Sequence, residues 1–144
     1  MVFVLFCTAT TPTCASFPVT ATKCISLLTA VYSDYDMAVF PNSLGDADAS
    51  AAKTHFDALQ SIVGCHVNAE LFFCSKIFPD CPDKGWTRQP CRQLCEAIQT
   101  SCQSAYDAAY PSNTWPWDCN DLHDTGAANA LCLHPEGGES STLH

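Results

Sequence analysis

The chain has 144 residues, the size of one domain, and its 47% apolar composition suits a globular core. A formal net charge of −9, with only six Lys and Arg residues, argues against a nucleic-acid or anionic-membrane partner, because both are bound through clusters of basic side chains. Eleven cysteines indicate disulfides, and therefore secretion or an extracellular location.

The first residues favour a residual signal segment over residues 1–13. Residues 1–7, MVFVLFC, resemble the apolar part of a signal peptide without its basic start, and residues 8–10 are small enough for a cleavage site. Cleavage would remove Cys7 and leave an even ten cysteines. Retained, Cys7 would be an unpaired or intermolecular thiol, and the latter would give a dimer. No apolar run approaches the ~20 residues of a transmembrane segment.

The next stretch reads as short, mostly extended segments. Residues 10–22 are rich in Thr and contain two prolines, which predicts a loop or extended chain. Residues 25–31 fit either a short helix or a strand, whereas residues 32–40 alternate weakly, as in a strand or extended arm. Pro41-Asn42 ends this segment, and residues 43–46 are predicted to form a turn.

Apolar residues then recur at helical spacing, which predicts a helix over residues 49–63. Asp46 or Asp48 is suited to cap its first turn, and Gly64 is placed to end it. A second short helix is predicted over residues 68–78, NAELFFCSKIF. Its apolar side chains spread around the axis, so it should be buried or offer one face to a ligand.

Residues 90–109 carry the clearest helical pattern, and their first residue is a proline, which suits the first position of a helix. Cys91, Cys95 and Cys102 fall within ~40° of one another on the helical wheel. Three sulfurs that face one way indicate a helix joined to other segments. Tyr110-Pro111 ends it. The predicted buried arc comprises Cys91, Leu94, Cys95, Ile98, Cys102, Ala105 and Ala109.

The rest of the chain, residues 112–144, has no regular period. Residues 115–119 and 131–133 are predicted to be irregular segments held by disulfides. The last ten residues, 135–144, include GGESST and are predicted to be a disordered tail.

Several motifs together resemble the Frizzled-type cysteine-rich domain. They are Phe40-Pro41-Asn42, the LFFCSKIFPDC of residues 71–81, the PCRQLCEAIQTSC of residues 90–102, Trp115-Pro116 before Cys119, and Leu131-Cys132-Leu133. The resemblance places this domain at residues 14–134.

The resemblance implies a mainly α-helical fold with short β-strands, a four-helix core and five disulfides. Spacing alone cannot choose among the many ways of pairing ten cysteines. The pairs that the resemblance implies are Cys14–Cys81, Cys24–Cys74, Cys65–Cys102, Cys91–Cys132 and Cys95–Cys119.

The resemblance also implies an extracellular ligand-binding module, either secreted or the ectodomain of a longer membrane protein. The expected partner is a Wnt-type lipidated protein, or a free fatty acid or sterol, bound in an apolar groove. Four residues match the groove: Leu44, Phe72, Ile77 and Phe78. In the helix of residues 68–78, Leu71 and Phe73 are expected in the core, and Ile77 or Phe78 at the surface. Lys76 and Asp80 place charge near this groove.

The alternative function is a structural or adhesion module of a larger extracellular protein, with no lipid ligand. An enzyme is not expected, because the five histidines are scattered and form no recognisable nucleophile motif. No metal is expected, since the cysteine spacings differ from paired zinc knuckles, and no cofactor is expected. Glu96 belongs to a solvated helix face and is assigned no chemistry.

Overall fold

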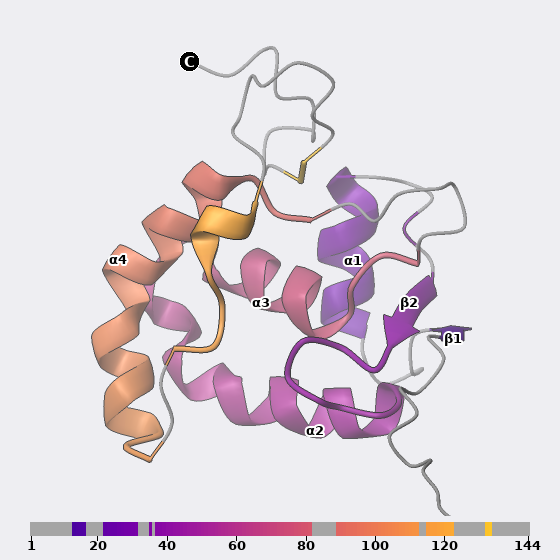
Figure 1. Ribbon diagram of the computed structural model, residues 1–144, viewed down its shortest axis with the longest axis horizontal. Helices are drawn as coiled ribbons and strands as arrows, with labels where there is room; N and C mark the ends of the chain where they lie inside the picture. Colours follow the sequence, from indigo (N-terminus) through magenta and orange to yellow (C-terminus); the bar gives the residue numbers. More distant parts are fainter. Residues whose placement is uncertain are drawn as a thin grey trace, which may run out of the picture.

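The computed structural model describes residues 13–16, 22–31, 35, 37–81, 89–112, 115–122 and 132–133. The elements, in chain order, are β1 (Thr13–Ser16), α1 (Thr22–Val31), β2 (Met37–Phe40), α2 (Ala49–Leu59), the 3-10 helix η2 (Gln60–Cys65), α3 (Ala69–Ile77), α4 (Arg92–Ala109) and the 3-10 helix η3 (Cys119–Asp121). Helix α3 lies at the centre, in contact with α1, α2 and α4 (Figure 1). The predicted mainly α-helical fold with short strands is confirmed.

The burial of α3 follows from its composition. Seven of its nine residues are buried, on all sides of the axis. A short helix that is apolar all round is stable only when neighbours cover every side. The prediction of a buried helix is confirmed, and its position between three other helices explains why.

Helix α4 packs one face on the core and begins later than predicted. The buried face runs through Leu94, Cys95, Ile98 and Cys102 and ends at Tyr106, rather than at Ala109. The helix starts at Arg92 instead of residue 90, because the preceding backbone is extended. There, the amide of Cys91 donates to the carbonyl of Leu133 at 3.0 Å, and Pro90 and Leu133 form a parallel bridge.

Helix α2 is capped as predicted but ends differently. The Asp48 carboxylate accepts a 2.9 Å hydrogen bond from the amide of Ala51 in the first turn. The α-helix stops at Leu59 and continues as the tighter η2, which carries Cys65 toward its disulfide with Cys102. The prediction that Gly64 ends the helix is wrong, since Gly64 lies within η2.

Two short strands form the only sheet in the described part of the chain. β1 and β2 pair antiparallel, with Thr13 opposite Phe40 and Ser16 opposite Met37. Strand β2 also bonds the chain that leaves α3, where the amide of Val39 donates to the carbonyl of Pro79 at 2.9 Å. Residues 25–31, for which the sequence left a helix and a strand open, lie in helix α1, which begins at Thr22.

Five disulfides tie these elements together, with sequence separations from 24 to 67 residues. They join Cys14 to Cys81, Cys24 to Cys74, Cys65 to Cys102, Cys91 to Cys132 and Cys95 to Cys119. These are the pairs that the resemblance implies. Bridges over loops of this length each stabilise a fold by about 2–4 kcal/mol in the chain-entropy model.

The C-terminal segment, here residues 115–122, is held by aromatic packing as well as by the disulfide of Cys119. The Trp117 ring lies 5.4 Å from that of Phe72 and 5.7 Å from that of Phe73, between centroids. Trp115 stacks on Phe72 at 6.4 Å and meets Tyr106 edge to face at 5.5 Å. Residues 115–122 are therefore fixed against both α3 and α4.

The predicted signal segment, apart from Thr13 in β1, and the predicted tail lie outside the described residues. Among the helices that are described, none is both long and apolar enough to cross a membrane.

Candidate ligand-binding surface

The turn between β2 and α2 is organised by one side chain, that of Asn42, which is only 8% exposed. Its amide group donates to the Asp46 carboxylate and to the backbone carbonyl of Ile77, both at 2.9 Å. Its oxygen accepts from the amides of Leu44 at 3.0 Å and Asp46 at 2.9 Å. Two donors and two lone pairs are all that an asparagine side chain offers, so its bonding capacity is filled.

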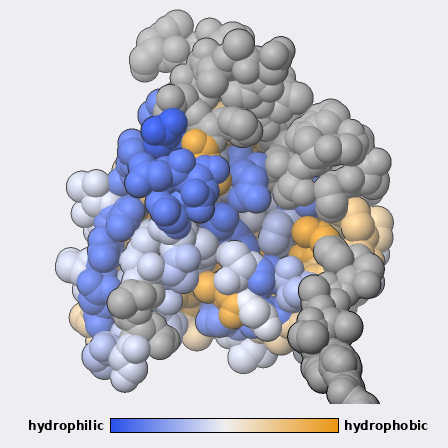
Figure 2. Space-filling view, in the orientation of Figure 1, coloured by the Kyte–Doolittle hydropathy of each residue, from blue (hydrophilic) through white to orange (hydrophobic). Residues whose placement is uncertain are grey.

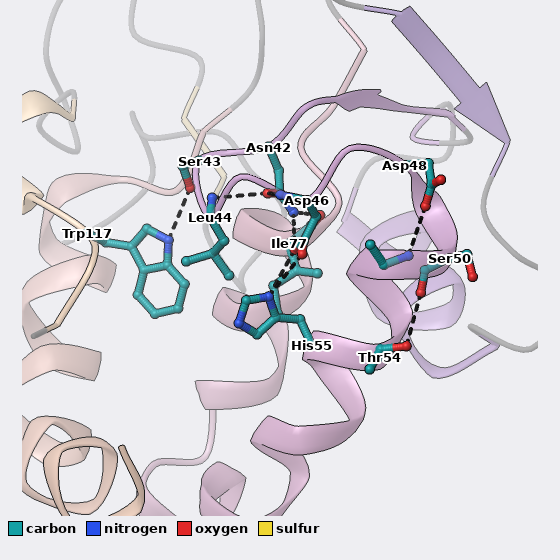
Figure 3. Close-up of polar contacts among 11 residues, drawn as sticks. Asn42, Ser43, Leu44, Asp46, Asp48, Ser50, Thr54, His55, Ile77 and Trp117 are labelled. Atoms are coloured by element: carbon teal, nitrogen blue, oxygen red, sulfur yellow. Dashed lines mark hydrogen bonds and ion pairs between the residues drawn. The ribbon is translucent and has the colours of Figure 1, made fainter. Parts of the chain in front are cut away.

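Two further features hold the turn in its conformation, one within it and one from α2 (Figure 3). Gly45 takes a φ of 85°, a left-handed conformation that glycine adopts without steric cost. From α2, His55 Nδ1 lies 3.1 Å from both carboxylate oxygens of Asp46. The turn is consequently fixed to α2 and to the end of α3, rather than being a free loop.

This turn presents Leu44 beside the C-terminal segment. Leu44 is partly exposed and packs on the edge of the core. The indole N–H of Trp117 donates to Ser43 Oγ at 3.3 Å, next to it. In the view of Figure 3, the Leu44 side chain lies between Trp117 and His55. Figure 2 shows an apolar patch over this end of the loop, with polar surface around it.

The other three residues predicted to line a groove lie elsewhere. Phe72, Ile77 and Phe78 have no exposed surface. The expectation that Ile77 or Phe78 reaches the surface is wrong, because other segments pack over the C-terminal end of α3, where both residues lie. The Phe78 ring, for example, meets that of Phe40 edge to face at 6.3 Å. Leu44 is the one of the four that reaches the surface.

A cleft of about 360 Å³ opens beside the Leu44 turn. It is lined by Ser43, Lys76, Gln89, Pro116, Trp117, Asp118, Asp121 and Leu122. Of these, the sequence drew attention to Lys76 as a nearby charge and to the Trp-Pro-Trp stretch as an irregular segment. The contribution of Gln89, Asp121 and Leu122 was missed, and no local signal pointed to them.

Lys76 sits half-buried at the edge of this cleft and donates a 3.0 Å hydrogen bond to the side-chain oxygen of Gln89. Burial lowers the pKa of Lys76, and the negative charge of Asp121 only partly opposes that effect. The apolar surface of Leu122 and the edge of Trp117, which is 4% exposed, thus meet a cationic group and two carboxylates. The cleft offers a bound molecule both apolar surface and polar groups.

Comparison with known proteins gives a family match. The model of the Fz domain matches residues 24–126. The chain is 30% identical to Frizzled-6 of Mus musculus over 123 residues, 82% of this chain and 16% of that protein. It is 34% identical to Protein mom-5 of Caenorhabditis elegans over 113 residues, 75% of this chain and 19% of that protein. It is 32% identical to human Carboxypeptidase Z over 108 residues, 67% of this chain and 16% of that protein. The chain spans less than a fifth of the length of each of these relatives.

Proposed function

Because this chain belongs to the Fz domain family and is an extracellular module, we propose that it binds a Wnt-type lipidated protein, or a free fatty acid or sterol, at the surface around Leu44. The single observation that supports this proposal is the rigid presentation of Leu44. Leu44 is partly exposed next to a cleft, and the hydrogen bonds of Asn42 fix the turn that carries it. A leucine side chain in this position is suited to contact an apolar ligand.

Binding at this surface depends on apolar area removed from water. Each buried CH₂ contributes about 0.8 kcal/mol, so about six methylenes covered by Leu44 and Leu122 contribute about 5 kcal/mol. The cost of association offsets part of this gain, so contacts from the rest of the ligand must add to it. Because the turn is already ordered, little conformational entropy is lost when the ligand binds.

Three of the predicted groove residues lie beneath this surface rather than on it: Phe72, Ile77 and Phe78. They fill the space around α3, and the carbonyl of Ile77 accepts one of the bonds that position the turn. A charged substitution at Ile77 is therefore a poor probe of ligand binding, since a carboxylate with no exposed surface would unfold the domain.

The test measures the affinity of the purified protein for a peptide carrying an ester-linked C16 monounsaturated acyl chain. The same peptide without the acyl chain, and a fluorescent sterol, are measured in parallel. Leu44→Glu should weaken acyl-peptide binding at least tenfold. Val67→Glu is the matched control, because Val67 is an apolar residue 92% exposed on another part of the surface. It should leave the affinity unchanged.

The proposal fails if acylated and unacylated peptides bind equally, or if Leu44→Glu and Val67→Glu have the same effect. Binding of the sterol alone, still sensitive to Leu44→Glu, would retain the surface and narrow the ligand to free lipids.

A further inference from the structure

Two adjoining depressions run along the outer side of α4. They share Glu96, Gln99 and Gln103. One, of about 500 Å³, continues along the helix to Asp107. The other, of about 480 Å³, continues across to residues 115–120. Together they make a continuous surface, called here the α4 groove. In Figure 2 the face over α4 and η3 is among the most hydrophilic in view.

The length of the α4 groove follows from helical geometry. Glu96, Gln103 and Asp107 stand at i, i+7 and i+11, so they share one side of the helix. From residue 96 to residue 107 the helix rises about 16 Å, at 1.5 Å per residue. An extended peptide covers that distance with about five residues. The dimensions match a short extended segment better than a single small molecule.

The described residues that line the α4 groove carry charge of one sign. Glu96, Asp107 and Asp118 supply carboxylates, and all three are exposed. Among the described residues that line the groove, none is Lys or Arg. Arg92, the one basic residue of α4, lies a turn before Glu96 and outside the lining. The remaining helix positions offer the amide groups of Gln99 and Gln103, which hydrogen-bond to each other at 3.0 Å. They also offer the hydroxyl groups of Thr100 and Ser104. Amide and hydroxyl groups both donate to and accept from a peptide backbone.

An aromatic surface lies at one end of the α4 groove. Trp115 is partly exposed there. Its ring cannot turn freely, since it stacks on Phe72 and lies 5.1 Å from Trp117 and 5.5 Å from Tyr106. A guanidinium group is stabilised over an indole face by cation–π attraction and pairs with carboxylates through two parallel hydrogen bonds. Trp115 with Asp118 and Glu96 provides both kinds of partner.

We propose that the α4 groove binds a basic, extended segment of a protein partner, with an arginine side chain against Trp115. Charge complementarity identifies the occupant, because an anionic groove of this length, with no Lys or Arg among its described lining residues, favours a cationic peptide over a neutral or acidic one. This interaction does not depend on the lipid site. The two lie side by side, since Pro116, Trp117 and Asp118 line both the α4 groove and the cleft next to Leu44.

The test uses fluorescence anisotropy with a labelled octapeptide of alternating Arg and Ser, at 50 mM and 150 mM salt. A peptide with Gln in place of Arg is the comparison ligand. Glu96→Gln and Asp107→Asn should each weaken binding two- to fivefold, the range for an exposed ion pair. Asp57→Asn is the matched control, because it changes the net charge equally on α2, where Asp57 pairs with Lys53. It should change the affinity by less than 1.5-fold.

Equal weakening by Asp57→Asn would overturn the proposal, as it would show attraction to net charge alone. The proposal would also be overturned if the Gln peptide bound as tightly as the Arg peptide. The same holds if spermidine or Ca²⁺ displaced the labelled Arg peptide at a lower concentration than the unlabelled Arg peptide does. Leu44→Ala, which adds no charge beside the α4 groove, should leave peptide binding intact, so failure at the lipid surface and failure at the α4 groove are distinguishable.

Discussion

The side chain of Asn42 donates a 2.9 Å hydrogen bond to the backbone carbonyl of Ile77, 35 residues later in the chain. Ile77 is the last residue of α3, and the last carbonyls of a helix have no partner within it. One amide therefore satisfies a buried helix end and, through its other bonds, shapes the turn that carries Leu44. Stability and the proposed binding surface depend on the same side chain.

Asn42→Ala should lower the free energy of unfolding by about 2–4 kcal/mol. It removes four hydrogen bonds and leaves the Ile77 carbonyl buried without its side-chain partner. Urea denaturation followed by circular dichroism measures the change. Asn68→Ala is the control, because Asn68 precedes α3 without a side-chain capping bond, and its effect should stay within about 0.5 kcal/mol. Equal losses in the two variants would contradict the role given to Asn42.

Leu44 and Ile77 should respond oppositely to truncation. Ile77→Ala should cost about 2–5 kcal/mol of stability, because it empties space inside a fully buried site. Leu44→Ala should cost about 1 kcal/mol or less, yet weaken binding of the acyl peptide. Denaturant midpoints and peptide affinities, measured on the same preparations, separate the two effects. If Ile77→Ala folded with wild-type stability, its placement in the core would be untenable.

Asp48→Ala should destabilise the domain by about 1 kcal/mol through loss of the α2 cap. Asp48→Asn is the informative comparison, since an amide oxygen also accepts from the Ala51 N–H. The asparagine variant should retain nearly full stability in thermal unfolding. A loss of equal size in both variants would point to the charge of Asp48 rather than to its capping bond.

Stability should rise with pH in the alkaline range because of Lys76. Burial lowers the pKa of Lys76 from its usual 10.5, so the unfolded chain binds this proton more tightly than the folded chain does. The free energy of unfolding therefore increases with pH between the lowered pKa and 10.5. Above about 10 an opposing effect begins, since burial raises the pKa of Tyr106 and the unfolded chain ionises first.

Urea denaturation at intervals from pH 7 to 9.5 tests the Lys76 prediction below the range of Tyr106. Lys76→Met should flatten the rise, whereas Lys53→Met, which removes a lysine from an exposed ion pair on α2, should preserve it. If the free energy of unfolding of Lys76→Met rose with pH as steeply as that of the wild type, a group other than Lys76 would be responsible for the rise.

The sequence predicted the elements whose pattern is local. Helix α4 was evident from its repeating cysteines and α3 from its apolar composition. The α2 cap was narrowed to Asp46 or Asp48, of which Asp48 makes the bond. The role of Asn42 was not predictable in this way, because its partner lies 35 residues away. The bond from Trp117 to Ser43 spans 74 residues, so the cleft it borders was also hidden. Ile77 and Phe78 were misplaced at the surface, since helical spacing cannot show which neighbours cover a helix end.

The disulfide framework reaches beyond the family match at residues 24–126. Cys14 lies before that range and Cys132 after it, while their partners, Cys81 and Cys91, lie inside. A polypeptide shortened to residues 24–126 would retain both partners as free thiols. During oxidative refolding their thiolates would attack the three remaining bridges and yield scrambled isomers. The smallest unit that can oxidise to a single product therefore runs from Cys14 to Cys132.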